Sequence, residues 1–278
     1  MDGIFDFSDY GALLQLVSGS IVAGTVLGIV GGLIGVFVMQ RDMAFAVHGI
    51  SELSFAGAAA ALLLGANVVG GSIVGSILAA AVIGLLGRRA RDRNSIIGVL
   101  MPFGLGLGIL FLSLYQGRSG NKFGLLTGQI IAVDSPQLGL LIGISVVVLA
   151  VLLIVWRPLT FDSLDPEVAV ARGVPSRALS LVFMVVLGLT VAESVQIIGA
   201  LLVLALLVTP AAAALRVSAS PVLVPVLSMT FGFVSAVGGI LIAIGSTLPI
   251  SPFITTISFA IYLVCRVIGS RRLSRLAS

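Results

Sequence analysis

The stretch LGLLIGISVVVLAVLLIVW, residues 138–156, decides the fold class of this chain. It contains no charged residue, and its length suits one membrane-spanning helix, which needs about 20 apolar residues. Its apolar residues form a continuous run, whereas a strand of a membrane β-barrel alternates apolar and polar positions. The stretch therefore predicts a transmembrane α-helix.

The overall composition extends this prediction to the whole chain. Of the 278 residues, 59% are hydrophobic and 9% are charged, whereas a soluble domain has about 25% charged residues. The single cysteine, Cys265, excludes an internal disulfide framework and a multi-cysteine metal centre. We expect an all-α membrane protein that forms one transmembrane domain over residues 1–278.

The apolar runs predict about nine spans, at 13–38, 44–64, 70–87, 95–115, 138–156, 179–193, 195–215, 221–245 and 251–268. Eight spans is the alternative, because 179–215 must hold a tight hairpin of short helices. Residues 123–137 are too few to cross the membrane, and we expect them to form a re-entrant half-helix. Glycines at G-x-x-x-G spacing, as at Gly28/Gly32 and Gly104/Gly108, predict closely packed helices within the chain.

The basic residues predict the orientation. With the N-terminus outside, every arginine except Arg118 faces the cytoplasm, and Lys122 joins Arg118 outside. Because cytoplasmic loops are rich in Lys and Arg, we expect an external N-terminus and a cytoplasmic C-terminus in a bacterial inner membrane. The pI near 10 reflects this topology, so we expect no nucleic-acid partner.

The longest hydrophilic stretch, about 158–178, contains the signals of a short helix. Asp165 is a capping acid, Pro166 suits the first turn, and Glu167 adds a second acid near the positive end of the helix dipole. Gly173 then ends the helix. We interpret this segment as a cytoplasmic surface helix on which a soluble partner docks.

Few ionisable groups fall within the predicted spans, and His48 and Glu52 are two of them. Four residues apart, they share one face of a helix. An imidazole and a carboxylate suit zinc, manganese or iron(II), so the pair is a candidate metal pathway. The alternative is a structural pair whose members satisfy each other.

Two further acids are candidates for a gate. Glu193 lies where we expect a solvated outer turn between the sixth and seventh spans, and Asp134 lies near the outer half-helix.

The sequence offers no motif for enzymatic chemistry. Its one lysine, Lys122, stands between Asn121 and Phe123, so it contains no G-K-[ST] phosphate loop. H-E-x-x-H and G-x-S-x-G are also absent. We expect a protein that is not an enzyme and does not bind ATP by that route.

Three segments resemble the metal-type (zinc/manganese/iron) permeases of bacterial ATP-binding-cassette importers. They are GGLIGVFVMQRDMAFAVHGISELSFAGAAAALLLG (31–65), LDPEVAVARGVPSRALSLV (164–182) and VQIIGALLVLALLVTPAAAALR (195–216). The second is similar to the family's coupling helix, which assigns Asp165, Glu167 and Gly173 to the ATPase contact. In the first, His48 stands where the family commonly has Asp, and Glu52 where it commonly has His.

This resemblance implies a homodimer, two cytoplasmic ATPase subunits and an extracytoplasmic metal-binding receptor. It implies no permanently bound cofactor, only a transported divalent ion (manganese, zinc or iron). One alternative is a permease of the same architecture for an iron chelate or cobalamin, which would need no His48/Glu52 pair. Another is a stand-alone secondary metal transporter, which would show inverted repeats.

Overall fold

The computed structural model describes residues 10–87, 90–117, 133, 135–246 and 250–276, and every element in these ranges is a helix. Eight of the helices are long and apolar enough to cross a membrane. They are α2 (Ser18–Gln40), α3 (Ala44–Leu63), α4 (Val68–Leu86), α5 (Ala90–Leu114), α7 (Ser135–Leu164), α9 (Ser176–Ile198), α12 (Leu223–Ile244) and α13 (Ile250–Leu276). The shorter elements are α1 (Tyr10–Leu16), α8 (Pro166–Ala171), η2 (Ala200–Leu202), α10 (Val203–Leu207) and α11 (Thr209–Val217).

Among the described residues, the helices of spanning length number eight, the alternative count, because the expected seventh span, 195–215, is not one helix. Its residues are divided among the end of α9, η2, α10 and α11. Gly199, with φ +83°, ends α9. Pro210 lies in the first turn of α11, where its missing amide hydrogen costs no helical hydrogen bond.

The half-helix expected over 123–137 falls largely outside the described residues, as does Asp134. Residues 135–137 already belong to α7.

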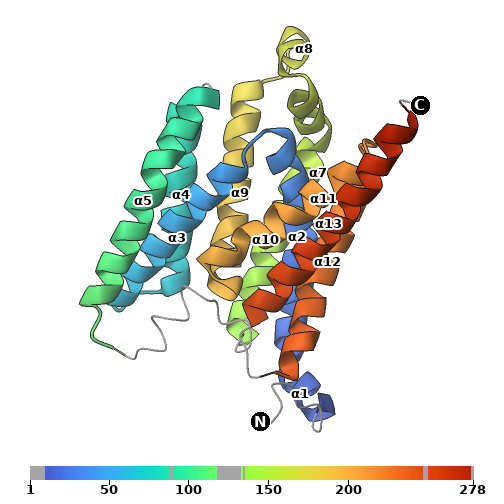
Figure 1. The fold of residues 1–278 in the computed structure, drawn as a ribbon. Coiled ribbons are helices and arrows are strands. Elements are labelled where there is room, and N and C mark those ends of the chain that lie inside the picture. Colours follow the sequence, from blue (N-terminus) through green and yellow to red (C-terminus); the bar gives the residue numbers. More distant parts are fainter. Residues whose placement is uncertain (1–9, 88–89, 118–132, 134, 247–249, 277–278) are drawn as a thin grey trace. The chain divides into compact units, whose positions relative to one another are not determined.

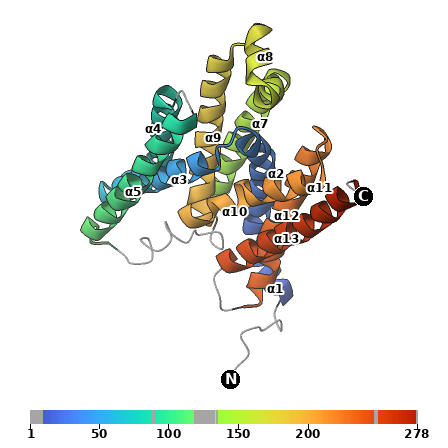
Figure 2. The same ribbon diagram turned by 45° about the horizontal axis from the view of Figure 1, so that its top comes forward.

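The chain divides into two compact units. The first comprises residues 1–39, 130–140 and 204–278, and the second comprises 40–129 and 141–203. In the first unit, α11, α12 and α13 pack against one another, and Figure 2 shows α12 and α13 side by side. In the second unit, α3 contacts both α4 and α5, and α4 also contacts α9 (Figure 1).

Glycines make the helix contacts close in both units, as their spacing predicted. Gly28 and Gly32 of α2 lie against the backbone of α12, and the hydroxyl of Ser228 donates to the carbonyl of Gly32. In the second unit, Gly57 of α3 faces Gly71 of α4, with each near the other's carbonyl oxygen. Without side chains at these positions, the backbones come into direct contact, which packs helices where lipid supplies no hydrophobic driving force.

Candidate functional site

The His48–Glu52 pair lies on α3, one helical turn apart. Its Nε2 and Oε1 atoms are 3.6 Å apart, and the side chains are 26% and 4% exposed. A separation of 3.6 Å is too long for a hydrogen bond. Two further buried atoms, Nδ1 of His48 and Oε2 of Glu52, have no hydrogen-bond partner in the described part of the chain. The two side chains therefore face each other without satisfying each other.

The backbone beneath this pair is tightly held by α5. A methyl group added at Gly104 would lie 3.0 Å from both the carbonyl carbon of Glu52 and the amide nitrogen of Leu53. One turn further along α5, Gly108 lies against the ring of Phe55. Within α3 itself, the hydroxyl of Ser51 donates to the carbonyl oxygen of His48 at 2.8 Å. These contacts hold the α3 backbone, while Nδ1 of His48 and Oε2 of Glu52 have no hydrogen-bond partner among the described residues.

The pair brings together a nitrogen and an oxygen atom of the kinds that bind divalent cations. For a small divalent cation such as zinc, bonds of about 2.1 Å in tetrahedral geometry place two ligand atoms roughly 3.4 Å apart. The observed 3.6 Å is close to that spacing. Among the described residues, no group of three or more His, Cys, Asp or Glu side chains could hold a metal ion. Within the described part of one copy, the pair therefore offers at most two ligand atoms at this point.

Glu193 is not in the solvated turn that the sequence predicted. It lies inside α9 and is 3% exposed. The hydroxyl of Ser145, on α7, donates to the carboxylate of Glu193 at 3.2 Å to Oε1 and 3.4 Å to Oε2. The helix continues past residue 193 because Glu193, Ser194 and Val195 include no helix-breaking residue, and it ends only at Gly199.

The short helix α8 has the start and end that the sequence predicted. The carboxylate of Asp165 accepts a hydrogen bond from the amide of Val168 at 3.1 Å, and Glu167 lies in the first turn. Gly173 has φ +82°, and the amide of Val174 donates to the carbonyl of Ala169 at 3.0 Å. The preceding residues 158–164 belong to α7, with Pro158 inside that helix, so the separate surface helix is shorter than the predicted segment.

A second polar cluster, between Arg41 and Asp162, has no counterpart in the sequence-based predictions. The Nη1 atom of Arg41 donates to Oδ2 of Asp162 at 2.8 Å and to the hydroxyl of Ser163 at 3.2 Å. Its Nη2 atom donates to the hydroxyl of Ser180 at 2.6 Å, and the guanidinium lies 5.6 Å from the ring centroid of Phe183. Arg41 and Asp162 are 121 positions apart in the sequence, and no local spacing signals such a contact.

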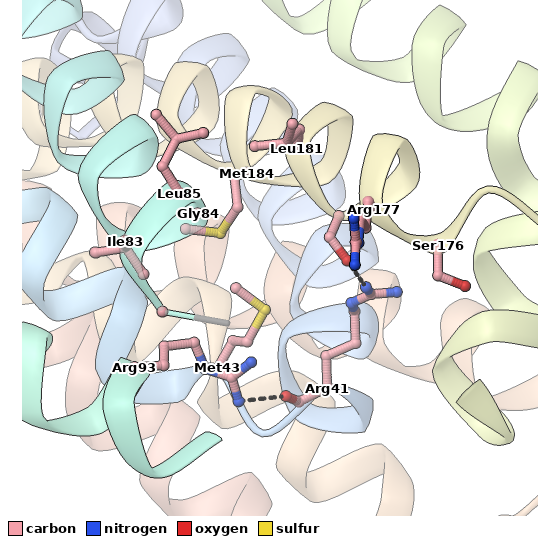
Figure 3. Close-up of a pocket in the computed structure, with 12 residues that line it drawn as sticks. Arg41, Met43, Ile83, Gly84, Leu85, Arg93, Ser176, Arg177, Leu181 and Met184 are labelled. Atoms are coloured by element: carbon pink, nitrogen blue, oxygen red, sulfur yellow. Dashed lines mark hydrogen bonds between the residues drawn. The ribbon is translucent and has the colours of Figure 1, made fainter. Parts of the chain in front are cut away.

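Arg93 fixes the same region from α5. Its Nη2 atom donates to the carbonyl oxygens of Arg41 and Asp42 at 3.2 and 3.3 Å, and Figure 3 shows the first of these bonds. Asp42 has φ 54°, a conformation uncommon outside glycine. The turn between α2 and α3 is therefore held in place by side chains of other helices.

Comparisons with known proteins agree with this fold and with the earlier resemblance. The sequence model of a family described as the ABC 3 transport family matches residues 14–269. The manganese transport system membrane protein MntC of Halalkalibacterium halodurans is 31% identical over 80% of this chain and 76% of its own length. The manganese import system permease protein ScaB of Streptococcus parasanguinis is 28% identical over 97% of this chain and 96% of its own.

A solved structure described as PsaBC from Streptococcus pneumoniae in complex with Fab is similar over nearly the whole fold. It has a TM-score of 0.83 and 28% identity, covering 94% of this chain and 95% of the other. The likeness thus extends over both compact units.

Proposed function

This chain belongs to the ABC 3 transport family, and from that premise we propose that it is the membrane-spanning permease subunit of an importer for a divalent transition metal. Manganese is the first candidate cargo, because relatives that cover most of the chain are manganese transport proteins by name. Separate ATPase subunits supply the energy, and the cargo is a substrate that passes through without being retained.

The single observation that carries this proposal is the unsatisfied His48–Glu52 pair. A structural pair in a buried helix normally satisfies its polar atoms, since each unsatisfied one costs about 1–3 kcal/mol. Here the two facing atoms are 3.6 Å apart, and one further atom on each side chain has no partner among the described residues. A passing cation would satisfy both side chains. Nitrogen and oxygen ligands without a thiolate suit manganese, iron(II) and zinc.

A second copy of the chain completes the site in this proposal. Two copies that bring α3 together across a shared axis supply two imidazoles and two carboxylates. Transport also requires that binding be weak enough for the ion to leave. Two ligands from each subunit meet that requirement better than a closed cage within one chain, because separating the subunits releases the ion.

We assign α8 to the contact with the ATPase. Asp165 and Glu167 begin this helix, and Gly173 ends it. These local signals determine where the helix starts and stops before α9. Two apolar side chains of α8, Val168 and Val170, are 44% and 60% exposed, and Leu164, the last residue of α7, is 65% exposed. Exposed apolar side chains close together in the chain suit contact with a soluble partner.

The remaining parts of the proposal follow from this assignment. α8 and the C-terminus face the cytoplasm of a bacterium, and the N-terminus faces outward across the inner membrane, where a metal-binding receptor delivers the ion. Glu193 and Asp134 remain gate candidates. Because Glu193 is buried, its role as a gate requires α7 and α9 to separate during the transport cycle.

The test combines uptake with stability. His48→Ala and Glu52→Ala are each expressed in cells that lack other manganese, zinc and iron importers, and uptake of each metal is measured. We expect uptake to fall at least tenfold, while the melting temperature of the purified chain stays close to that of the wild type. Ser113→Ala is the control, since its exposed hydroxyl donates to the carbonyl of Leu110 in its own helix.

Two results would reject the metal pathway. One is normal uptake of all three metals by both variants. The other is a loss of uptake that only parallels a loss of folded protein, which would make the pair structural.

A further inference from the structure

A cavity in the second unit lies where several helices end together. Its volume is about 510 Å³, within the range of small-molecule sites. Residues of the α2–α3 turn, the last turns of α4, the start of α5 and the first turns of α9 line it (Figure 3). We call it the arginine pocket, because its polar lining residues are Arg41, Arg93, Arg177, Ser176 and Ser180.

Two of the three arginines carry charge that no acid in the described part of the chain neutralises at ion-pair distance. Arg41 is paired with Asp162. No ion pair joins Arg93 or Arg177 to a described carboxylate, and the buried Nε of Arg93 has no hydrogen-bond partner there. The nearest other acid on the α2–α3 turn, Asp42, is exposed and meets Arg93 through its carbonyl oxygen.

The arginines are placed to receive an anion. Arg93 is held by its bonds to the carbonyls of Arg41 and Asp42, so its guanidinium is fixed before any ligand arrives. Arg177 is exposed at the start of α9 beside Ser176. Guanidinium groups bind phosphate through paired hydrogen bonds, and holding one in place reduces the entropy lost on binding.

The rest of the lining is apolar, which favours an anion that also carries an apolar group. This apolar part of the lining consists of Met43, Ile83, Leu85, Leu181 and Met184. Leu85 and Leu181 are 60% and 39% exposed, and they lie on α4 and α9, two helices of spanning length. A soluble anion gains nothing from these side chains, whereas an acyl chain does.

We propose that the arginine pocket binds the phosphate headgroup of an acidic phospholipid, with the acyl chains along Leu85 and Leu181. Basic pockets between membrane helices commonly hold such headgroups. The bound lipid joins the α2–α3 turn to the first turn of α9, the helix that follows α8. It thereby stabilises the spacing between these two segments.

Native mass spectrometry of the full-length chain in a neutral detergent tests this proposal. We expect phosphatidylglycerol to be retained at least tenfold better than phosphatidylcholine. Arg177→Gln should reduce that retention several-fold, and Arg93→Gln combined with Arg177→Gln should remove most of it. Arg172→Gln is the control, because it removes the same charge from the exposed end of α8 without lining the pocket.

Two further features of the experiment separate loss of lipid binding from loss of folding and from binding of a soluble anion. Since Arg93 also holds the α2–α3 turn, the exposed Arg177→Gln variant alone decides the case if the double variant does not fold. Leu181→Asn should weaken the retention of phosphatidylglycerol while leaving any binding of inorganic phosphate unchanged.

Three outcomes overturn the proposal. Equal retention of phosphatidylcholine would show that binding does not require an acidic lipid. Unchanged retention of phosphatidylglycerol by Arg177→Gln would show that the lipid does not bind in the arginine pocket. Inorganic phosphate that displaces the lipid at similar concentration makes this a site for a soluble anion.

Discussion

The second unit contains two polar pairs of opposite character. Arg41 and Asp162 are 2.8 Å apart, with two serine hydroxyls and an aromatic ring around the guanidinium. His48 and Glu52 are 3.6 Å apart, and each has a buried atom without a described partner. Oδ1 of Asp162 also has no hydrogen-bond partner in the described part of the chain, so the difference lies in the facing atoms, which are at hydrogen-bond distance in the first pair and too far apart in the second. We call the first the closed pair and the second the open pair, and this distance separates a pair that holds two helices together from a candidate transport site.

The largest expected loss of stability comes from a substitution in the closed pair. Asp162→Ala leaves the guanidinium of Arg41, whose side chain is 12% exposed, without its carboxylate. Breaking a buried pair in this way costs about 3 kcal/mol of folding free energy. We expect a clear drop in melting temperature in detergent, with uptake reduced only as far as folded protein is lost.

Replacing both members of that pair provides the control. Arg41→Met combined with Asp162→Leu removes the charges together and should cost less than Asp162→Ala. If Asp162→Ala melts like the wild type, the closed pair is not structural and the comparison fails.

An intermediate effect is expected where α5 supports the open pair. Gly104→Val places a side chain against the backbone of Glu52 and Leu53. Overpacking of this kind costs about 1–3 kcal/mol and displaces α3. Melting temperature and metal uptake should both fall. Gly106→Ala, on the same helix with open space around it, should change neither.

A substitution in the open pair itself should reduce transport with little change in stability. Glu52→Gln keeps the size of the side chain and removes the charge that a cation requires. We expect at least a tenfold loss of manganese uptake, equivalent to about 1.4 kcal/mol, with a melting temperature near that of the wild type. A drop in melting temperature comparable to that of Asp162→Ala would place the pair in the structural class.

The smallest expected effect lies outside the two pairs, at the cap of α8. Asp165→Ala removes the bond to the amide of Val168 and costs about 1 kcal/mol locally. Because α9 is the one described helix that α8 contacts appreciably, global melting should barely change. In the assembled importer, ATP hydrolysis should continue while uptake falls a few-fold. Asp165→Asn should restore uptake, since asparagine also caps helices.

Local patterns in the sequence predicted most of the fold. Continuous apolar runs indicated the long helices, the D-P-E signal indicated the start of α8, and glycine spacing indicated the close contacts. Glu193 shows the limit of such patterns. A single acid near an expected helix end was interpreted as solvated, but α9 continues for five residues beyond it, to Ile198, and buries it against Ser145.

The candidate site was predictable only in part. Two residues four apart on one helix could be paired from spacing alone, and the structure confirms that His48 and Glu52 face each other. Arg41 and Asp162 could not, because their contact depends on tertiary packing between segments 121 positions apart. Sequence spacing predicts contacts within one helix, and pairs between distant helices need the three-dimensional structure.

The glycine contacts also determine how far the sequence of this protein can drift over generations. Gly57 and Gly71 have each other's carbonyl oxygen where a methyl group would go, so selection should remove nearly every variant at these two positions. Gly98 and Gly143 face open space within helices, and alanine there should raise helical stability by up to about 1 kcal/mol each. The same residue type thus occurs at fixed and at freely changing positions. A lineage that gains alanine at the open positions acquires a reserve of stability, which can offset costly changes near His48 and Glu52 as the ion preference evolves.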